Sequence, residues 1–100
     1  MAITKEVNEV YTWGDGTYGQ LGKRGEICSE PEVVEELLGK DIFKGSCGYD
    51  FTACLTQQEG KVYIFGSNVN FKLGIDSPNM QENFPKCVDG LIGIKKVNFI

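Results

Sequence analysis

Residues 10–22 read VYTWGDGTYGQLG, and the same pattern returns 52 residues later in the chain. The two segments share a Val-Tyr pair, a following glycine, a Leu-Gly pair and one aromatic position. The aligned pairs are Val10 and Val62, Tyr11 and Tyr63, Trp13 and Phe65, Gly14 and Gly66, Leu21 and Leu73, and Gly22 and Gly74. Self-similarity at a period of about 50 residues indicates a repeat architecture.

The downstream halves of the two segments also align, now at an offset of 54 residues. The matched pairs are Pro31 and Pro85, Val34 and Val88, Leu37 and Leu91, and Gly39 and Gly93. The offset returns to 52 at Ile42 and Ile94, so one copy carries a two-residue insertion. The chain is therefore nearly two copies of one unit.

The repeated unit has the composition of β-structure. Residues 9–13 and 61–65 are rich in β-branched and aromatic side chains, and residues 51–56 alternate in the manner of a half-buried strand. Further short strands are predicted near residues 32–35, 42–47, 85–89 and 94–99. Residues 31–38 are the only helical candidate, and their apolar spacing does not decide between the two states. We therefore predict an all-β fold.

Composition excludes several functions for a chain of 100 residues, which has room for one small core. Lysine and arginine number 10 against 14 acidic residues, which gives a formal net charge of −4. Because nucleic-acid affinity depends on clustered basic residues, direct nucleic-acid binding is not expected. The longest apolar runs are far shorter than the roughly 18 residues of a membrane helix, so no membrane span is expected.

The chain has four cysteines and no histidine. Without histidine, zinc sites and serine or cysteine catalysis lack a usual component, so we expect no metal, no cofactor and no enzymatic activity. The cysteine spacings contain no C-x-x-C pair, and the N-terminal residues lack a signal-peptide pattern. We therefore predict reduced, buried cysteines and an intracellular location, cytoplasmic or nuclear. Two disulfides among Cys28, Cys47, Cys54 and Cys87 remain the alternative.

Residues 14–19 also satisfy the dinucleotide-binding pattern G-x-G-x-x-G after a predicted strand. That motif requires a helix whose N-terminus holds the pyrophosphate. The residues that follow contain Gly22, Gly25 and Pro31, which disfavour a helix. We therefore interpret these glycines as turn residues and expect no cofactor-binding residue.

Together, residues 10–22, 46–48, 51–56 and 60–66 resemble the signature segments of the regulator of chromosome condensation repeat family. The resemblance runs from about residue 10 to residue 99. The matching signature residues are Trp13, Gly14, Gly19, Leu21, Gly22, Cys47, Gly48, Leu55, Phe65, Gly66, Leu73 and Gly74. The chain departs from the family pattern at Phe51, where the family usually has histidine, and at Phe71, which replaces glycine.

The resemblance implies a seven-bladed β-propeller with four-stranded antiparallel blades, of which this chain would be a fragment. It divides the chain into a lead-in at residues 1–9, a half blade at 10–40, a complete blade at 41–90 and the first strand of the next blade at 91–100. Because so few repeats cannot close a ring, we expect further blades in cis or from other copies.

For function, the resemblance implies a scaffold that docks other proteins, and alternatively part of a guanine-nucleotide exchange factor for a small GTPase. No residue is carried over as exchange-competent. We predict that the aromatic residues at positions 11, 13, 63 and 65 pack in the core rather than form a recognition surface. The glutamates between residues 26 and 36 are expected to form a solvated edge, with attraction of a basic partner as the alternative.

Overall fold

The computed structural model describes residues 1–5, 7–23, 25, 27–57, 60–69, 73 and 78–88. Within this part of the chain the structure is built from β-strands and one short 3₁₀ helix. Their bounds are β1 Ala2–Ile3, β2 Val10–Asp15, β3 Ile27–Val33, η1 Glu35–Leu37, β4 Ile42–Cys47, β5 Phe51–Thr56, β6 Val62–Ser67 and β7 Gln81–Cys87. The predicted all-β fold is confirmed.

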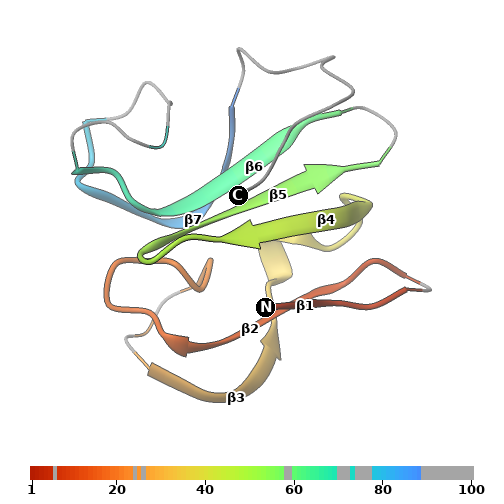
Figure 1. The fold of residues 1–100 in the computed structure, drawn as a ribbon, viewed down its shortest axis with the longest axis horizontal. Coiled ribbons are helices and arrows are strands. Elements are labelled where there is room, and N and C mark those ends of the chain that lie inside the picture. Colours follow the sequence, from red (N-terminus) through yellow and green to blue (C-terminus); the bar gives the residue numbers. More distant parts are fainter. Residues whose placement is uncertain are drawn as a thin grey trace.

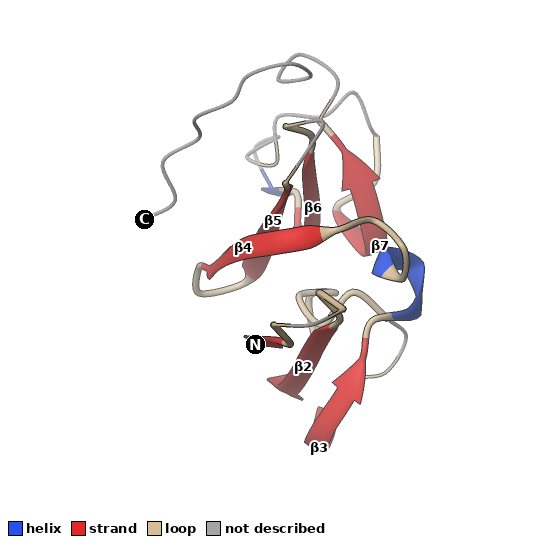
Figure 2. Cartoon of the chain, turned by 90° about the vertical axis from the view of Figure 1, so that its right-hand side faces the viewer, coloured by secondary structure: helices blue, strands red, loops and turns tan. Residues whose placement is uncertain are grey.

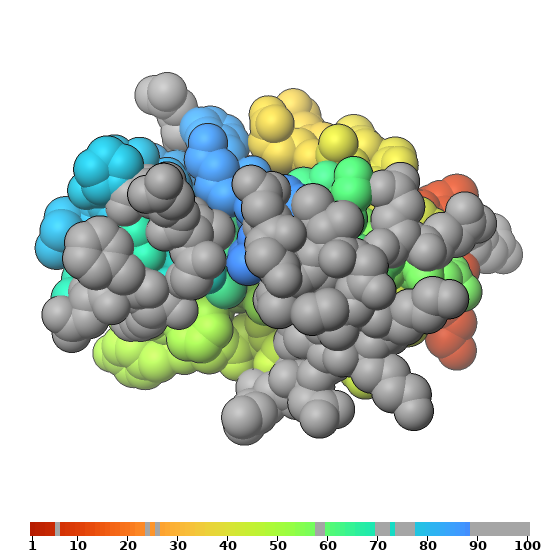
Figure 3. Space-filling view, turned by 90° about the horizontal axis from the view of Figure 1, so that it is seen from above, coloured from red at the N-terminus to blue at the C-terminus, as the bar shows by residue number. Residues whose placement is uncertain are grey.

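The described strands form two antiparallel sheets that lie as two layers (Figures 1 and 2). One sheet has the order β1-β2-β3 and the other has the order β4-β5-β6-β7, so every strand lies beside its neighbour in sequence. The second sheet is a four-stranded antiparallel meander. The connection between the sheets passes through η1, which contacts β7 beside it (Figure 3).

Strand pairing follows the two copies of the repeat residue by residue. Tyr11 pairs with Val33 as Tyr63 pairs with Cys87, and Gly14 pairs with Cys28 as Gly66 pairs with Glu82. The amide of Val34 donates to the Val10 carbonyl over 2.8 Å, and the amide of Val88 donates to the Val62 carbonyl over the same distance. The offset is 52 in the first strand of each pair and 54 in the second. The two-residue insertion therefore lies in the loop that joins them.

Each copy also has an irregularity in its ladder at the same place. The register shifts between Thr12 and Gly14 in β2, and between Ile64 and Gly66 in β6. Both glycines have positive φ angles, +101° at Gly14 and +122° at Gly66. Glycine adopts this region without the strain that a Cβ introduces, and it is the residue that β-bulges commonly use. The glycine of the repeat is thus explained by backbone geometry.

Two clusters of buried side chains hold the fold together. The first lies between the sheets and contains Val10, Val34, Leu37, Ile42, Cys54 and Phe65. The second contains Ala53, Leu55, Val62, Ile64, Leu73 and Val88. Because β5 contributes Cys54 to one cluster and Leu55 to the other, it is buried on both faces. The prediction of a half-buried strand at residues 51–56 is therefore wrong.

Some predicted strand limits also require correction. β3 begins at Ile27 and ends at Val33, not near residues 32–35, because β2 pairs along its whole length beyond the bulge. β7 begins at Gln81 for the same reason. The helical candidate at residues 31–38 contains only the short η1. In the segment predicted as a lead-in, β1 adds a two-residue strand beside β2. The predicted strand at residues 94–99 lies outside the described residues.

Candidate interaction surface

One end of the two sheets carries the connections that follow β2, β4 and β6. We call the described residues 16–23, 48–50 and 78–80 the rim. The Thr52 hydroxyl donates to the Gln20 carbonyl over 2.9 Å, and the Ser67 amide donates to the Asp50 carbonyl over 2.8 Å. A Cβ placed on Gly19 would lie 2.6 Å from the Glu82 carbonyl oxygen. These contacts bring segments that are far apart in sequence to one surface.

The rim exposes large side chains that the sequence analysis did not single out. Tyr49 is 94% exposed, Met80 is 67% exposed and Tyr18 is 44% exposed. Tyrosine is enriched at protein interfaces because it offers a large apolar area together with a hydroxyl. The turn at residues 48–50 was the available signal, since a tyrosine between Gly48 and Asp50 has little chance of burial.

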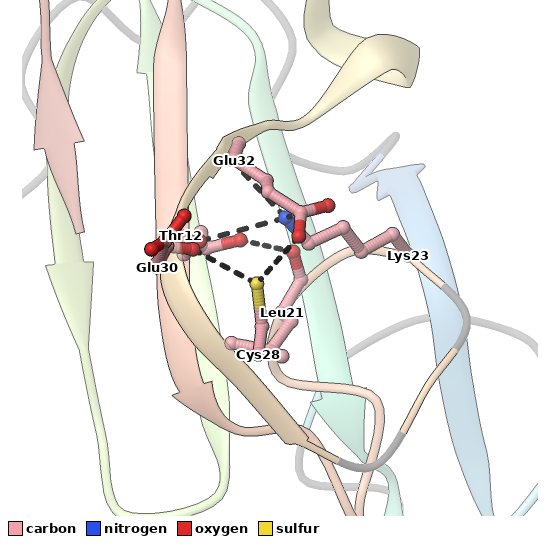
Figure 4. Close-up of polar contacts among 6 residues, drawn as sticks. All are labelled: Thr12, Leu21, Lys23, Cys28, Glu30 and Glu32. Carbon is pink, nitrogen blue, oxygen red and sulfur yellow. Dashed lines mark hydrogen bonds and ion pairs between the residues drawn. The ribbon is translucent and has the colours of Figure 1, made fainter.

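The first loop of the rim is fixed to the strands beneath it by polar contacts (Figure 4). The buried Thr12 hydroxyl donates to the Leu21 carbonyl over 2.7 Å. The ammonium group of Lys23 donates to the carbonyl of Glu32 over 3.2 Å and lies 3.8 Å from its carboxylate. Cys28 donates from Sγ to the Glu32 carboxylate over 3.2 Å. The loop is therefore held on β2 and β3 and presents its outer residues in a defined position.

The two equivalent aromatic residues have different environments. Phe65 is fully buried, and its ring would lie 2.9 Å from a Cβ added to Gly22 of the first copy. Trp13 is 42% exposed, so the prediction of core packing is confirmed for Phe65 and wrong for Trp13. The reason is that the second sheet places Phe65 against the first sheet, whereas no described sheet covers Trp13. Tyr11 and Tyr63 are half-buried, and the Lys40 ammonium lies 5.7 Å from the Tyr63 ring centre.

Three cavities open between the described elements. One of about 220 Å³ lies beside β2 and is lined by Met1, Thr12, Trp13, Asp15, Gly48 and neighbouring residues. Another of about 490 Å³ is lined by residues 79–84 and Lys86 at the rim. A third of about 250 Å³ separates the copies, where Lys23, Glu32 and Phe84 are among its lining residues. Each has polar and apolar groups on its walls, as a protein contact requires.

The four cysteines are free thiols, but they are not uniformly buried. Cys28 and Cys54 are buried and Cys87 is half-buried, whereas Cys47 is exposed because it ends β4 next to the rim. The prediction of buried cysteines is thus wrong for Cys47 and only partly met by Cys87. Burial, with the nearby Cys47 thiol adding to it, raises the pKa of Cys54 to about 12, so Cys54 stays protonated.

Charged groups on the surface lie as predicted for a solvated edge. Glu30, Glu32, Glu35 and Glu36 are exposed on the outermost strand and on η1. At the rim, hydrogen bonds from the hydroxyl and amide of Thr17 lower the pKa of the Asp15 carboxyl group. Asp15 is therefore ionised at neutral pH and adds a negative charge next to Trp13.

The remaining signature residues fall into a buried group and a group at turns. Leu21, Leu55 and Leu73 are buried, and Gly19 and Gly22 have positive φ angles in the first loop. Gly48 is exposed, although a Cβ there would lie 2.4 Å from the Phe51 ring. Gly74 lies outside the described residues. The glycines of the dinucleotide-like pattern occupy β2 and the loop after it, and the described residues place no helix there.

Two packed antiparallel sheets, each built from one copy of a repeat, are the arrangement of neighbouring blades in a β-propeller. The described residues thus define a β-propeller repeat protein. The description of the regulator of chromosome condensation (RCC1) repeat matches residues 8–55, and a second description of this repeat matches residues 44–71. The chain belongs to the RCC1 repeat family.

Curated relatives are much longer than this chain. The E3 ubiquitin-protein ligase HERC2 of Mus musculus is 37% identical over 99 residues, which are 98% of this chain and 2% of that protein. The serine/threonine-protein kinase Nek9 of Xenopus laevis is 43% identical over 82 residues, 75% of this chain and 8% of the relative. The human X-linked retinitis pigmentosa GTPase regulator is 39% identical over 79 residues, 77% of this chain and 8% of the relative.

A solved structure supports the fold. Human WBSCR16 superimposes with a TM-score of 0.75 at 25% sequence identity, covering 83% of this chain and 21% of the other. Among the residues described for our chain, no helix has the length and apolar character needed to cross a membrane.

Proposed function

We propose that this chain acts as a non-catalytic scaffold that binds another protein through its rim. The observation that carries the proposal is the exposure of Tyr49 and Tyr18 on connections held by hydrogen bonds to buried strands. Rigid support lowers the entropy that such side chains lose on binding, and aromatic side chains contribute most to interface energies. The relatives named as a ligase and a kinase share only a small part of their length with this chain, so their activities are not assigned to it.

The test compares the rim with the opposite end of the sheets, where Val7 and Leu38 are 66% and 46% exposed. Proteins that bind the immobilised chain are identified and their affinities measured by calorimetry. Replacing Tyr18 and Tyr49 by serine should weaken binding by more than about tenfold, the size of a 1.4 kcal/mol loss. Replacing Val7 and Leu38 by serine serves as the matched control and should leave it unchanged. The opposite ranking of the two double variants would refute the proposal.

A second candidate is participation in guanine-nucleotide exchange on a small GTPase. It is supported by the name of one relative, a GTPase regulator, and by the family resemblance. A nucleotide-release assay with a panel of small GTPases tests it, because release that the chain does not accelerate would remove this candidate. The spacing of the cysteines supports an intracellular site of action, and this location is part of the proposal.

A further inference from the structure

β2 is paired along only part of the edge that faces β1. Ile3 pairs with Val10 and Ala2 pairs with Tyr11, and the described pairing of β1 with β2 ends there. In the second copy, β5 pairs with β6 along five consecutive residues, from Leu55 opposite Val62 to Phe51 opposite Gly66. Residues 12–15 of β2 are the equivalents of the positions on β6 that β5 covers. They have no strand partner on this side within the described residues.

The glycine of the repeat shows the same difference from its other side. At Gly66 a Cβ would lie 2.4 Å from the Asp50 carbonyl oxygen and 2.5 Å from Phe51 Cα, so the glycine admits the backbone of β5. At Gly14 nothing lies within 4 Å of the same position. The first copy therefore has the space that a neighbouring strand fills in the second.

A cavity of about 220 Å³ opens at this place, with Thr12, Trp13 and Asp15 among its lining residues. The other edge of the same sheet is different. β3 contains Pro31, which lacks an amide hydrogen, and it exposes Glu30 and Glu32. Proline and charged residues are features that disfavour pairing at a sheet edge. Of the two edges, that of β2 is the one suited to accept a strand.

We propose that β2 binds an extended segment of a partner protein by strand addition beside residues 12–15, paired as β5 is paired with β6. Main-chain hydrogen bonds supply the attraction, and Gly14 allows the partner backbone to approach. The β5 template defines the chemistry of the partner, with an aromatic residue opposite Gly14 and a threonine-sized residue opposite Trp13, as Phe51 and Thr52 lie opposite Gly66 and Phe65. This inference deepens the proposed scaffold function, but it uses a different surface from the rim.

Trp13 provides a direct measurement, because it is the only tryptophan of the chain and lines the cavity. The probe is a synthetic peptide with the sequence of residues 48–56, carrying serine in place of its cysteine. Added to the full chain, it should shift Trp13 emission to the blue and reduce acrylamide quenching in a saturable manner. A scrambled peptide is the control. The absence of a saturable change at millimolar peptide would overturn the proposal.

Two glycine variants separate strand addition from a general effect on stability. Gly14 and Gly39 both have positive φ, +101° and +76°, and both have open space around the Cβ position. Gly14→Ala should weaken peptide binding at least about tenfold, because its methyl group meets the incoming backbone. Gly39→Ala has comparable backbone strain away from the edge and should retain the affinity of the unmodified chain. Equal binding by the two variants would contradict the model of pairing.

A further comparison does not depend on the folding of any variant. In a β-strand, alternate amides face the neighbouring strand. Peptides N-methylated at the positions of Phe51 and Ala53, or instead at those of Thr52 and Cys54, should therefore differ, with one set binding and the other not. Equal loss or equal retention would exclude strand addition. Because Tyr18 and Tyr49 are not involved, this failure would leave the proposed role of the rim standing.

Discussion

Adding a methyl group at Gly66 or at Gly14 gives a direct comparison of one backbone position in two settings. Each glycine has a positive φ angle, and alanine in such a conformation costs about 1–2 kcal/mol. For Gly14→Ala this is the expected loss of unfolding free energy, because no atom lies within 4 Å of the new Cβ. Gly66→Ala carries the same strain together with a collision.

The collision at Gly66 is with main-chain atoms, which do not move independently of the sheet. The new Cβ would lie 2.4 Å from the Asp50 carbonyl oxygen and 2.5 Å from Phe51 Cα. Separating them forces β5 away from β6, and overpacking of this kind costs about 1–3 kcal/mol. We therefore expect a loss of about 2–5 kcal/mol for Gly66→Ala, a large share of the roughly 5–15 kcal/mol that stabilises a small domain.

Urea unfolding followed by far-ultraviolet circular dichroism measures both losses with a common m value. Gly25→Ala is the control for backbone strain, because Gly25 has a φ of +117°, close to that of Gly66, with nothing within 4 Å of its Cβ position. It should behave as Gly14→Ala does. If Gly66→Ala is no more destabilising than the other two, the assignment of a close approach between β5 and β6 at this glycine is wrong.

Other predictions concern buried groups. Phe65→Ala should lower the unfolding free energy by about 3–5 kcal/mol, and Trp13→Ala by less than about 1 kcal/mol, both measured by urea unfolding; equal losses would contradict the different burial of the two rings. Thr12→Val should cost about 1–3 kcal/mol and speed amide exchange in the loop, since the Leu21 carbonyl loses its donor; unchanged exchange would count against this anchor. Cys54 has a pKa raised from 9.0 to about 12, so the unfolded thiol ionises first. Stability should be unaffected below about pH 9 and should fall as pH rises toward 12, by up to about 1.4 kcal/mol per pH unit. Cys54→Ala should remove that part of the loss, and identical alkaline profiles would refute it.

The repeat, the strand class and the special glycines could be predicted from sequence because each has a local signature. β4 and β5 have the predicted limits, and Gly14 and Gly66 have the positive φ angles expected after a strand. These features depend on residues that are close together in the chain. The ladder offset of 54 residues beyond the loop also follows from the alignment of Val34 with Val88.

The errors occur where a residue's environment depends on another part of the molecule. Trp13 and Phe65 have the same place in the repeat, but only Phe65 faces another described sheet. Alternation within β5 suggests one solvated face, and only the presence of Cys54 and Leu55 in separate clusters reveals two buried faces. Exposure of Tyr49 was missed because attention to aromatic residues was limited to those shared by both copies.

The two-residue difference between the copies is confined to the loop after β2 or β6, and the strand pairs on either side keep the same register. Such a frame separates two kinds of change during evolution. Insertions in the rim can accumulate without passing into the ladders, whereas a single-residue insertion inside a strand would turn its apolar side chains to the wrong face. Binding loops could therefore diversify in length and sequence on an unchanged blade, and the same property makes the rim a suitable place for grafting designed loops.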